Sequence, residues 1–214
     1  TGTGPGIYGL GLETFGPPPD ADGDPRILIL VMDILDGYAV TGNYLAGYFD
    51  YANEASPVRR EILYLDDRPL DLDSRLARST LVHEIQHMIH WKADPGEEKW
   101  VDEGGSEYGE RISGYADTND VAAAFLSFPD TSLIEWQDLP LDYEKAMLFI
   151  SYYGSRFSLP AVRDFVQNPE HGVPGFEKTL RSIPGAGTFL ELFADWTVAN
   201  LLDGSGRYGY GGLR

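Results

Sequence analysis

The chain has 214 residues, a length that suits one large domain or one domain built as two halves around a cleft. Its residues are 43% hydrophobic and 13% aromatic, which is enough for a substantial core and argues against intrinsic disorder. The formal net charge of −18 repels nucleic acid and anionic membranes, so we expect neither as a partner. Because the chain has no cysteine, disulfides and thiolate metal sites are excluded, and any metal must bind His, Asp or Glu.

The first third of the chain is predicted to be rich in strands. RILILVMDI (26–34) is a continuous apolar run, which is typical of a buried strand, and EILYLD (61–66) predicts a second strand. Between them, GNYLAGYFDY (42–51) mixes aromatic residues with glycine and is interpreted as a strand at the edge of the sheet. No apolar run reaches the roughly 18 residues that a membrane-spanning helix needs.

An acidic loop precedes the first predicted strand. DADGDP (20–25) lies within the loop-like segment GPPPDADGDP (16–25), and its acidic spacing is reminiscent of calcium loops. It lacks the glutamate that occupies the twelfth position of an EF-hand. We interpret it as a turn, with a calcium site as the alternative that nothing else in the sequence supports.

From residue 74 the pattern becomes helical. SRLARSTLVHEIQHMIHW (74–91) contains no glycine or proline, and DPG at 94–96 ends the segment. A second helix is predicted over 101–112, and further helices over 119–127, 143–156, 160–167, 175–182 and 187–202. A sheet-bearing part of about residues 1–92 followed by a helical part of about 93–214 predicts an α+β fold in a single domain, 1–214.

The first predicted helix carries the sequence HEIQH. His83 and His87 are four residues apart, so both side chains can face one metal ion. HExxH on a helix is a zinc-site pattern in which the glutamate, here Glu84, acts as general base. The alternative is two ordinary helix histidines. His90 lies a further turn along, and we interpret it as a packing or surface residue.

A catalytic zinc site needs a third protein ligand as well as a water molecule. The metzincin spacing would require glycine and histidine where this chain has His90 and Ala93, so that pattern is absent. WVDEGGSEYGE (100–110) offers Glu103 and Glu107 on one face of the next helix. One carboxylate can bind the metal while the other accepts the N–H of a ligating histidine, unless both are exposed helix glutamates.

HEIQH followed by DEGGSE resembles the gluzincin metallopeptidases, which use His, His and Glu as zinc ligands. The resemblance implies that Zn²⁺ binds His83, His87 and Glu103. Glu107 corresponds to the thermolysin-family acid that supports the first histidine. Asp102 stands where thermolysin-like enzymes, and aminopeptidases related to leukotriene A4 hydrolase, have asparagine.

STLVHEIQHMIHW together with WVDEGGSEYGE is most similar to hyicolysin-type secreted bacterial peptidases. The motif similarity covers roughly residues 79 to 156. It implies a zincin-like fold, with a mixed sheet and the active-site helix followed by a mainly helical half. It also implies a secreted, extracellular protein, although the sequence as given carries no signal peptide.

LDYEKAMLFISYY (141–153) resembles the YEKG segment of the aminopeptidase group, whose tyrosine stabilises the oxyanion. Tyr143 matches that tyrosine, and Ala146 replaces the glycine. His171, in NPEHGVPG, is the rival donor because thermolysin-like enzymes use a downstream histidine. With 13 tyrosines in the chain, an ordinary core or surface tyrosine is the alternative for Tyr143.

These features predict a zinc-dependent peptidase that acts on peptide or protein substrates. An endopeptidase is favoured, because residues 40–80 contain no GxMEN segment like the one with which the aminopeptidase group captures a free amine. An extended substrate could add to the sheet along GNYLAGYFD. The alternatives are a catalytically silent metal-binding module, against which Glu84 argues, and a zinc hydrolase or aminopeptidase with a different substrate.

Overall fold

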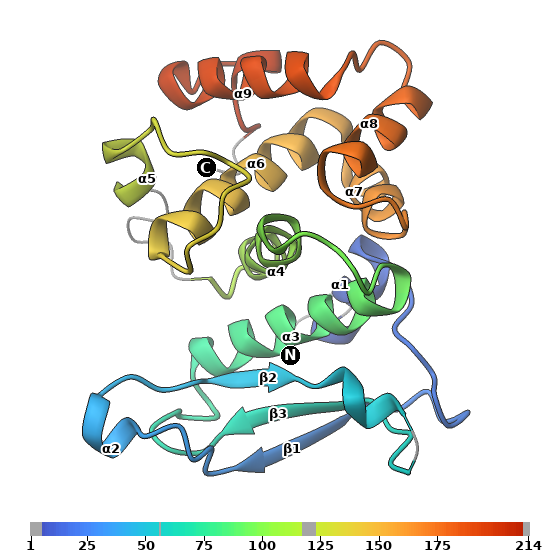
Figure 1. Cartoon of the computed structure of the whole chain (residues 1–214), viewed down its shortest axis with the longest axis vertical. Helices are drawn as coiled ribbons and strands as arrows, with labels where there is room; N and C mark the ends of the chain where they lie inside the picture. The colour runs from blue at the N-terminus through green and yellow to red at the C-terminus, as the bar shows by residue number, and fades with distance from the viewer. Residues whose placement is uncertain (1–5, 56, 117–122, 212–214) are drawn as a thin grey trace.

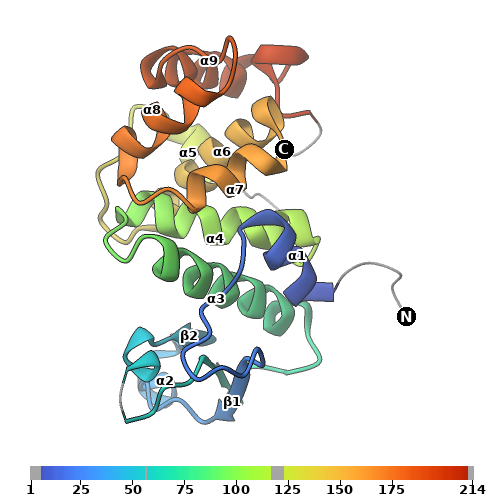
Figure 2. The same ribbon diagram turned by 90° about the vertical axis from the view of Figure 1, so that its right-hand side faces the viewer.

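The computed structural model describes residues 6–55, 57–116 and 123–211. Its elements are stacked in layers, as Figure 1 shows, with a small sheet at one end and α3 lying between the sheet and α4. The helices α6 to α9 lie on the other side of α4, and Figure 2 shows the same order from the side. The fold is α+β and mostly helical, as the sequence predicts.

The described part of the chain contains strands near its start and helices over most of its length. The strands are β1 (Leu28–Met32), β2 (Gly47–Phe49) and β3 (Ile62–Asp66). The helices are α1 (Gly6–Thr14), α2 (Tyr38–Thr41), α3 (Arg75–Ala93), α4 (Lys99–Ser113), α5 (Ala123–Ser127), α6 (Pro140–Phe157), α7 (Leu159–Val166), α8 (Gly172–Ser182) and α9 (Phe189–Leu202). Two short 3-10 turns cover Tyr51–Glu54 and Gly206–Tyr208.

The sheet is mixed and has the strand order β1-β3-β2. β1 runs parallel to β3 with Leu28 opposite Ile62, and β2 runs antiparallel to β3 with Gly47 opposite Leu65. β2 is therefore an edge strand of the described sheet, which confirms the interpretation of GNYLAGYFDY, although only three of its residues are in the strand. α3 packs against β2 and β3.

The prediction that the first strand is buried is wrong. All five residues of β1 are exposed, and Ile29 keeps 51% of its surface accessible. β1 is exposed because it forms one edge of the described sheet, whereas α3 packs on the other two strands, β3 and β2. A continuous apolar run predicts a strand but does not reveal which neighbours cover it.

The helix α3 begins and ends where the sequence predicts. The hydroxyl of Ser74 accepts the backbone N–H of Ala77 at 3.0 Å, which is an N-cap that satisfies one of the free donors of the first turn. The helix ends at Ala93, just before DPG. Its inner face buries Ile85, Met88 and Ile89 in the main core.

The later helices also lie at their predicted positions, with ends shifted by up to three residues. The predicted helix 119–127 is described from Ala123 onward, and its first four residues lie outside the described part of the chain. α1 was not predicted, because the glycines in GIYGLGLET weaken the helical pattern. It packs on α3 with Gly11 close to Ile85.

An aromatic core joins α4 to the helices beyond it. Trp100, in the first turn of α4, stacks on Phe176 of α8 with ring centroids 5.6 Å apart. It also meets Phe149 of α6 edge-to-face at 5.9 Å. Such aromatic pairs add to the stability that their burial provides, so they hold the helical layer firmly against α4.

Glycines let α4 approach its two neighbours closely. A Cβ on Gly104 would lie 3.0 Å from the backbone and side chain of Ala146 on α6. A Cβ on Gly105 would lie 2.5 Å from Nε2 of Gln86 on α3. The pair in DEGGSE therefore allows α4 to touch α3 on one side and α6 on the other.

The acidic loop at residues 20–25 has the contacts of a turn. The carboxylate of Asp20 accepts the backbone N–H of Gly23 at 2.8 Å, while Asp22 and Asp24 form ion pairs with Arg60 and Arg26 respectively. In the described residues this loop contributes to no cluster of metal-ligating atoms. No helix among the described residues is long and apolar enough to cross a membrane.

Replacing Gly104 by alanine tests the close approach of α4 to α6. The added methyl group meets backbone atoms that cannot rotate away, and we expect the free energy of unfolding to fall by about 1–3 kcal/mol. Urea denaturation of the metal-free protein measures this change. Arg181→Ala, at an exposed position of α8, is the control and should stay within about 0.5 kcal/mol. Equal stability of Gly104→Ala and the parent would contradict the packing.

Candidate metal centre

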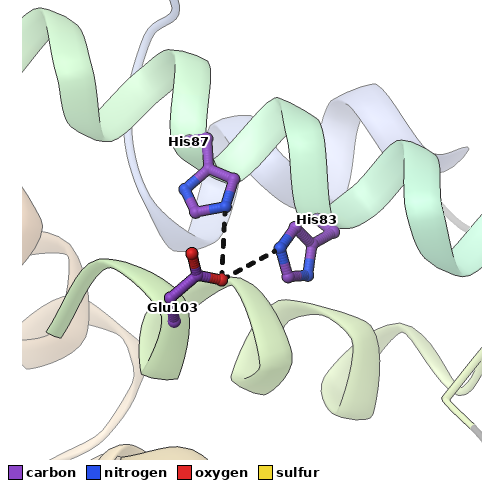
Figure 3. Close-up of side chains that lie close together, drawn as sticks. All are labelled: His83, His87 and Glu103. Atoms are coloured by element: carbon purple, nitrogen blue, oxygen red, sulfur yellow. Dashed lines mark ion pairs between the residues drawn. The ribbon is translucent and has the colours of Figure 1, made fainter. Parts of the chain in front are cut away.

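Two histidines of α3 and one glutamate of α4 converge at the interface of these helices. Nε2 of His83 is 3.4 Å from Oε2 of Glu103, and Nε2 of His87 is 3.7 Å from the same oxygen. Figure 3 shows both rings directed from α3 towards this one carboxylate on α4. The three residues form a group whose ligand atoms all lie within 4.8 Å of one another.

The arrangement fits a zinc ion. Ligand atoms about 2.0–2.1 Å from a tetrahedral zinc lie roughly 3.4 Å from each other, close to the two nitrogen–oxygen distances in the structure. Two imidazoles and one carboxylate also form a donor set of catalytic zinc sites, which leave one position for water. The three residues need little or no rearrangement to hold such an ion.

The other ring nitrogen of each histidine contacts a second carboxylate. Nδ1 of His83 lies 2.7 Å from Oε1 of Glu110, and Nδ1 of His87 lies 3.0 Å from Oδ1 of Asp102. A carboxylate at Nδ1 keeps the proton there and leaves the lone pair of Nε2 for a metal. Carboxylates of α4 therefore orient both histidines so that Nε2 is the nitrogen available to a metal.

The structure differs from the prediction that Glu107 supports the first histidine, because Glu110 makes the contact with Nδ1 of His83. Glu107 lies nearby, with a carboxylate oxygen within 4.8 Å of His83 and Glu110. Burial and the charge of Glu110 raise the pKa of Glu107 to about 7. Glu103, Glu107 and Glu110 line one face of α4, so their spacing does not reveal which one reaches His83. The hydroxyl of Ser79 donates to the second oxygen of Glu110.

Charged neighbours shift the pKa values of His87 and Glu103 against the effect of burial. Burial alone would lower the pKa of His87, but the neighbouring charges of Asp102 and Glu103 raise it to about 10. Burial opposes ionisation of Glu103 as well, yet His83 and His87 lower its pKa to about 2. The carboxylates and imidazoles therefore attract each other, and a metal cation bound here would compete with protons for the ring nitrogens.

Glu84 follows His83, one of the candidate ligands, on α3. Its side chain is only 7% exposed, and burial raises its pKa. The charges of His83 and His87, and the backbone N–H of Phe49 on β2, act in the opposite direction. Glu84 is therefore close to both histidines and to Phe49 of the edge strand.

Tyr143 lies in the first turn of α6, near enough to Glu103 to be influenced by its charge. Burial is the main cause of its raised pKa, and the negative charge of Glu103 contributes. The ring meets Trp136 edge-to-face with centroids 4.8 Å apart. Trp136 donates its indole N–H to Asp138 at 2.7 Å. Nζ of Lys99 lies 3.0 Å from Oδ1 of Asp138 and 3.8 Å from Oε1 of Glu103.

A buried ion pair fixes the start of α6 and therefore the position of Tyr143. Nζ of Lys145 lies 2.6 Å from Oδ1 of Asp142 and donates to the carbonyl oxygen of Glu135 at 2.7 Å. The second oxygen of Asp142 accepts the backbone N–H of Leu139 at 3.0 Å. Losing either partner would leave the other charge buried without compensation, which makes this end of the helix rigid.

His171, the alternative candidate for the oxyanion donor, lies near the C-terminal end of α3. His171 precedes α8, and its Nε2 lies 2.8 Å from Oδ1 of Asp94. Asp94 is seven residues beyond His87, about 10 Å further along the axis of α3. Tyr143, rather than His171, is the residue that the structure brings into the neighbourhood of Glu103.

Several residues of the site were not predicted. Asp102 was noted as a departure from a family pattern, without a role, and His90 was interpreted as a packing or surface residue. His90 is buried and contacts Asp102. Glu110 could have been found, because it is seven residues from Glu103 and so shares its helix face. Nothing in the sequence indicated the contact of Lys99 with Glu103.

Comparison with known proteins agrees with this chemistry. No protein-family model matches the chain. It is similar to the neutral metalloprotease ShpI of Staphylococcus hyicus, with 30% identity over 173 residues, which are 67% of this chain and 38% of the relative. The chain thus spans well under half the length of this relative. The similarity supports a metallopeptidase.

The contact of Glu110 with His83 predicts a difference between two neighbouring glutamates. Glu110→Gln weakens the acceptor at Nδ1, and we expect zinc affinity to fall by about 10–100-fold, as is typical for such partners. Glu107→Gln removes a charge from the same helix face without that contact and should have a smaller effect. Competition with a chromophoric chelator measures both dissociation constants. A larger loss in Glu107→Gln would restore the sequence-based assignment.

Proposed function

We propose that the chain is the catalytic domain of a zinc metallopeptidase, formed by residues 1–214, that hydrolyses peptide bonds in peptides or proteins. One observation carries the proposal: Nε2 of His83 and Nε2 of His87 face a single oxygen of Glu103 beside the buried Glu84. The similarity to a neutral metalloprotease supports the same reaction class. The resemblance to secreted peptidases extends the proposal to an extracellular protein.

In this mechanism His83, His87 and Glu103 hold the metal. When bound there, zinc would supply a Lewis acid for the scissile carbonyl and would lower the pKa of a water molecule. Glu110 and Asp102 keep the two imidazoles in the tautomer that presents Nε2.

Glu84 moves the proton. Its carboxylate accepts a proton from the attacking water and delivers it to the leaving amine. Burial, which raises its pKa, makes both transfers easier at neutral pH, because a base and an acid work best near the ambient pH. A metal-binding module without turnover would have no use for such a residue.

Tyr143 donates its hydroxyl to the oxyanion that develops on the substrate carbonyl. The buried pair of Lys145 and Asp142 holds this tyrosine in place before the substrate arrives. Preorganised donors of this kind are effective because they need no reorganisation in the transition state.

The substrate lies along β2. This edge strand of the described sheet is adjacent to α3 and Glu84, so an extended peptide can add to it as a further strand. A site open along a strand suits an endopeptidase. An aminopeptidase, or a hydrolase acting on another bond, would use the same metal centre.

Removal of the metal tests the proposal directly. The purified protein should cleave casein or an internally quenched peptide, lose this activity in a chelator, and regain it with zinc. Glu103→Ala removes a ligand and should lower zinc content, whereas Glu13→Ala, an exposed acidic residue of α1, should not. Cleavage of an amino-terminally blocked peptide identifies an endopeptidase. Activity that resists the chelator would refute the metallopeptidase.

Glu84→Gln separates the base from the ligands. The amide keeps the size of the side chain but cannot accept the proton, so we expect wild-type zinc content and at least about a 10²-fold loss of kcat. Metal analysis and steady-state kinetics on one preparation measure both. Loss of zinc in this variant would instead make Glu84 a ligand, and substantial turnover would exclude it as the base.

Tyr143→Phe tests the oxyanion donor and preserves the ring that packs on Trp136. Loss of one such donor costs about 10²–10³-fold in kcat, with little change in KM when the contact forms only in the transition state. His171→Ala, measured in parallel, should have nearly normal kinetics. The reverse result would assign the role to His171, and normal rates in both variants would eliminate both residues.

A further inference from the structure

A third histidine lies behind the metal centre. His90 is 1% exposed, although it is one turn of α3 beyond the ligand His87. Its Nδ1 lies 3.2 Å from Oδ1 of Asp102 and 3.2 Å from the side-chain amide nitrogen of Gln86. Its Nε2 is buried without a hydrogen-bond partner, and the closest carboxylate oxygen, on Glu97, is 3.8 Å away.

One oxygen of Asp102 lies between two imidazoles. Oδ1 is 3.0 Å from Nδ1 of His87 and 3.2 Å from Nδ1 of His90. An ionised carboxylate can only accept hydrogen bonds, so the contacts with Asp102 require a proton on Nδ1 of each imidazole. The amide nitrogen of Gln86 is itself a donor, so it only packs against Nδ1 of His90 in this tautomer. The proton on Nδ1 of His87 leaves its Nε2 lone pair for the metal.

Asp102 needs such support because of its position. It lies in the first turn of α4, and a third of its side-chain surface is exposed, so rotation about its side-chain bonds could carry the carboxylate into water. His90 holds the carboxylate from the buried side. The ring itself is held by packing, and Gln86 beside it accepts the hydroxyl of Ser106 on α4.

We propose that His90 is a positioning residue of the metal centre, which holds Asp102 against Nδ1 of His87 and so keeps Nε2 of His87 directed towards Glu103. This inference rests on the proposed zinc site. It differs from a packing role, because packing requires the volume of the ring, whereas positioning requires a donor at the place of Nδ1.

Three substitutions distinguish the two roles. The amide nitrogen of asparagine can occupy the place of Nδ1, that of glutamine reaches the place of Nε2, and phenylalanine fills the volume without a donor. We expect zinc affinity to fall about tenfold in His90→Phe and His90→Gln, at the lower end of what such partners contribute. His90→Asn should stay close to the parent, although it is the smallest of the three side chains.

The measurement is the dissociation constant for zinc, obtained by competition with a chromophoric chelator at equal folded fraction. The visible spectrum of the protein loaded with Co²⁺ reports ligand geometry and should change in His90→Phe but not in His90→Asn. Ile89→Val, a neighbouring buried change on α3, is the control for core damage and should leave both readouts unchanged. Neither readout depends on peptidase activity.

The outcomes separate this inference from the proposed function. Parental affinity in His90→Phe, or equal weakening in all three variants, would overturn the positioning role. If His90→Phe does not fold, the pair His90→Asn and His90→Gln decides, because only positioning at Nδ1 favours asparagine. If the His83→Ala variant binds zinc as tightly as the parent protein, the metal site itself is refuted.

Discussion

The close contact of α4 with α3 is the constraint on which the candidate site depends. Two side chains of α3 and one of α4 can share an ion only if the helices approach closely, and Gly104 and Gly105 remove the side chains that would keep α4 away from α6 and α3. Protein interiors are packed too tightly to absorb an extra methyl group without cost. The sequence DEGGSE thus provides a ligand and, directly after it, the space that lets this ligand reach its partners.

The same helix supplies most of the charge around the histidines. Asp102, Glu103 and Glu110 contact His83 or His87, and Glu107 lies among them. The attraction between these carboxylates and the two imidazoles explains the lowered pKa of Glu103 and the raised pKa of His87 despite their burial. Some of the chain's acidic residues are therefore partly buried in contact with the histidines, rather than on a fully solvated surface.

Sequence analysis was most successful where the signal is local. The helix of HEIQH and the order of strands and helices follow from spacing and from breakers such as DPG. The exposure of β1 did not follow, because burial depends on what packs against a strand. The choice of Glu110 over Glu107, and the burial of His90 against Asp102, depend on how α4 crosses α3. Spacing gives the helix face but not the partner. The roles of Tyr143 as oxyanion donor and Glu84 as general base remain predictions. The structure adds the residues that surround each of them.

The candidate centre joins the two predicted halves of the chain. His83, Glu84 and His87 come from the helix that lies on the sheet, Glu103 comes from the next helix, and Tyr143 comes from the helical layer beyond. A ligand that binds only the folded chain stabilises it, by about 2.7 kcal/mol at a concentration 100 times its Kd. A zinc ion held across α3 and α4 would stabilise their interface in this way. Side-chain contacts between α3 and α4, such as His83 with Glu110 and Gln86 with Ser106, already join the two helices, and the ion would add to them at the same place.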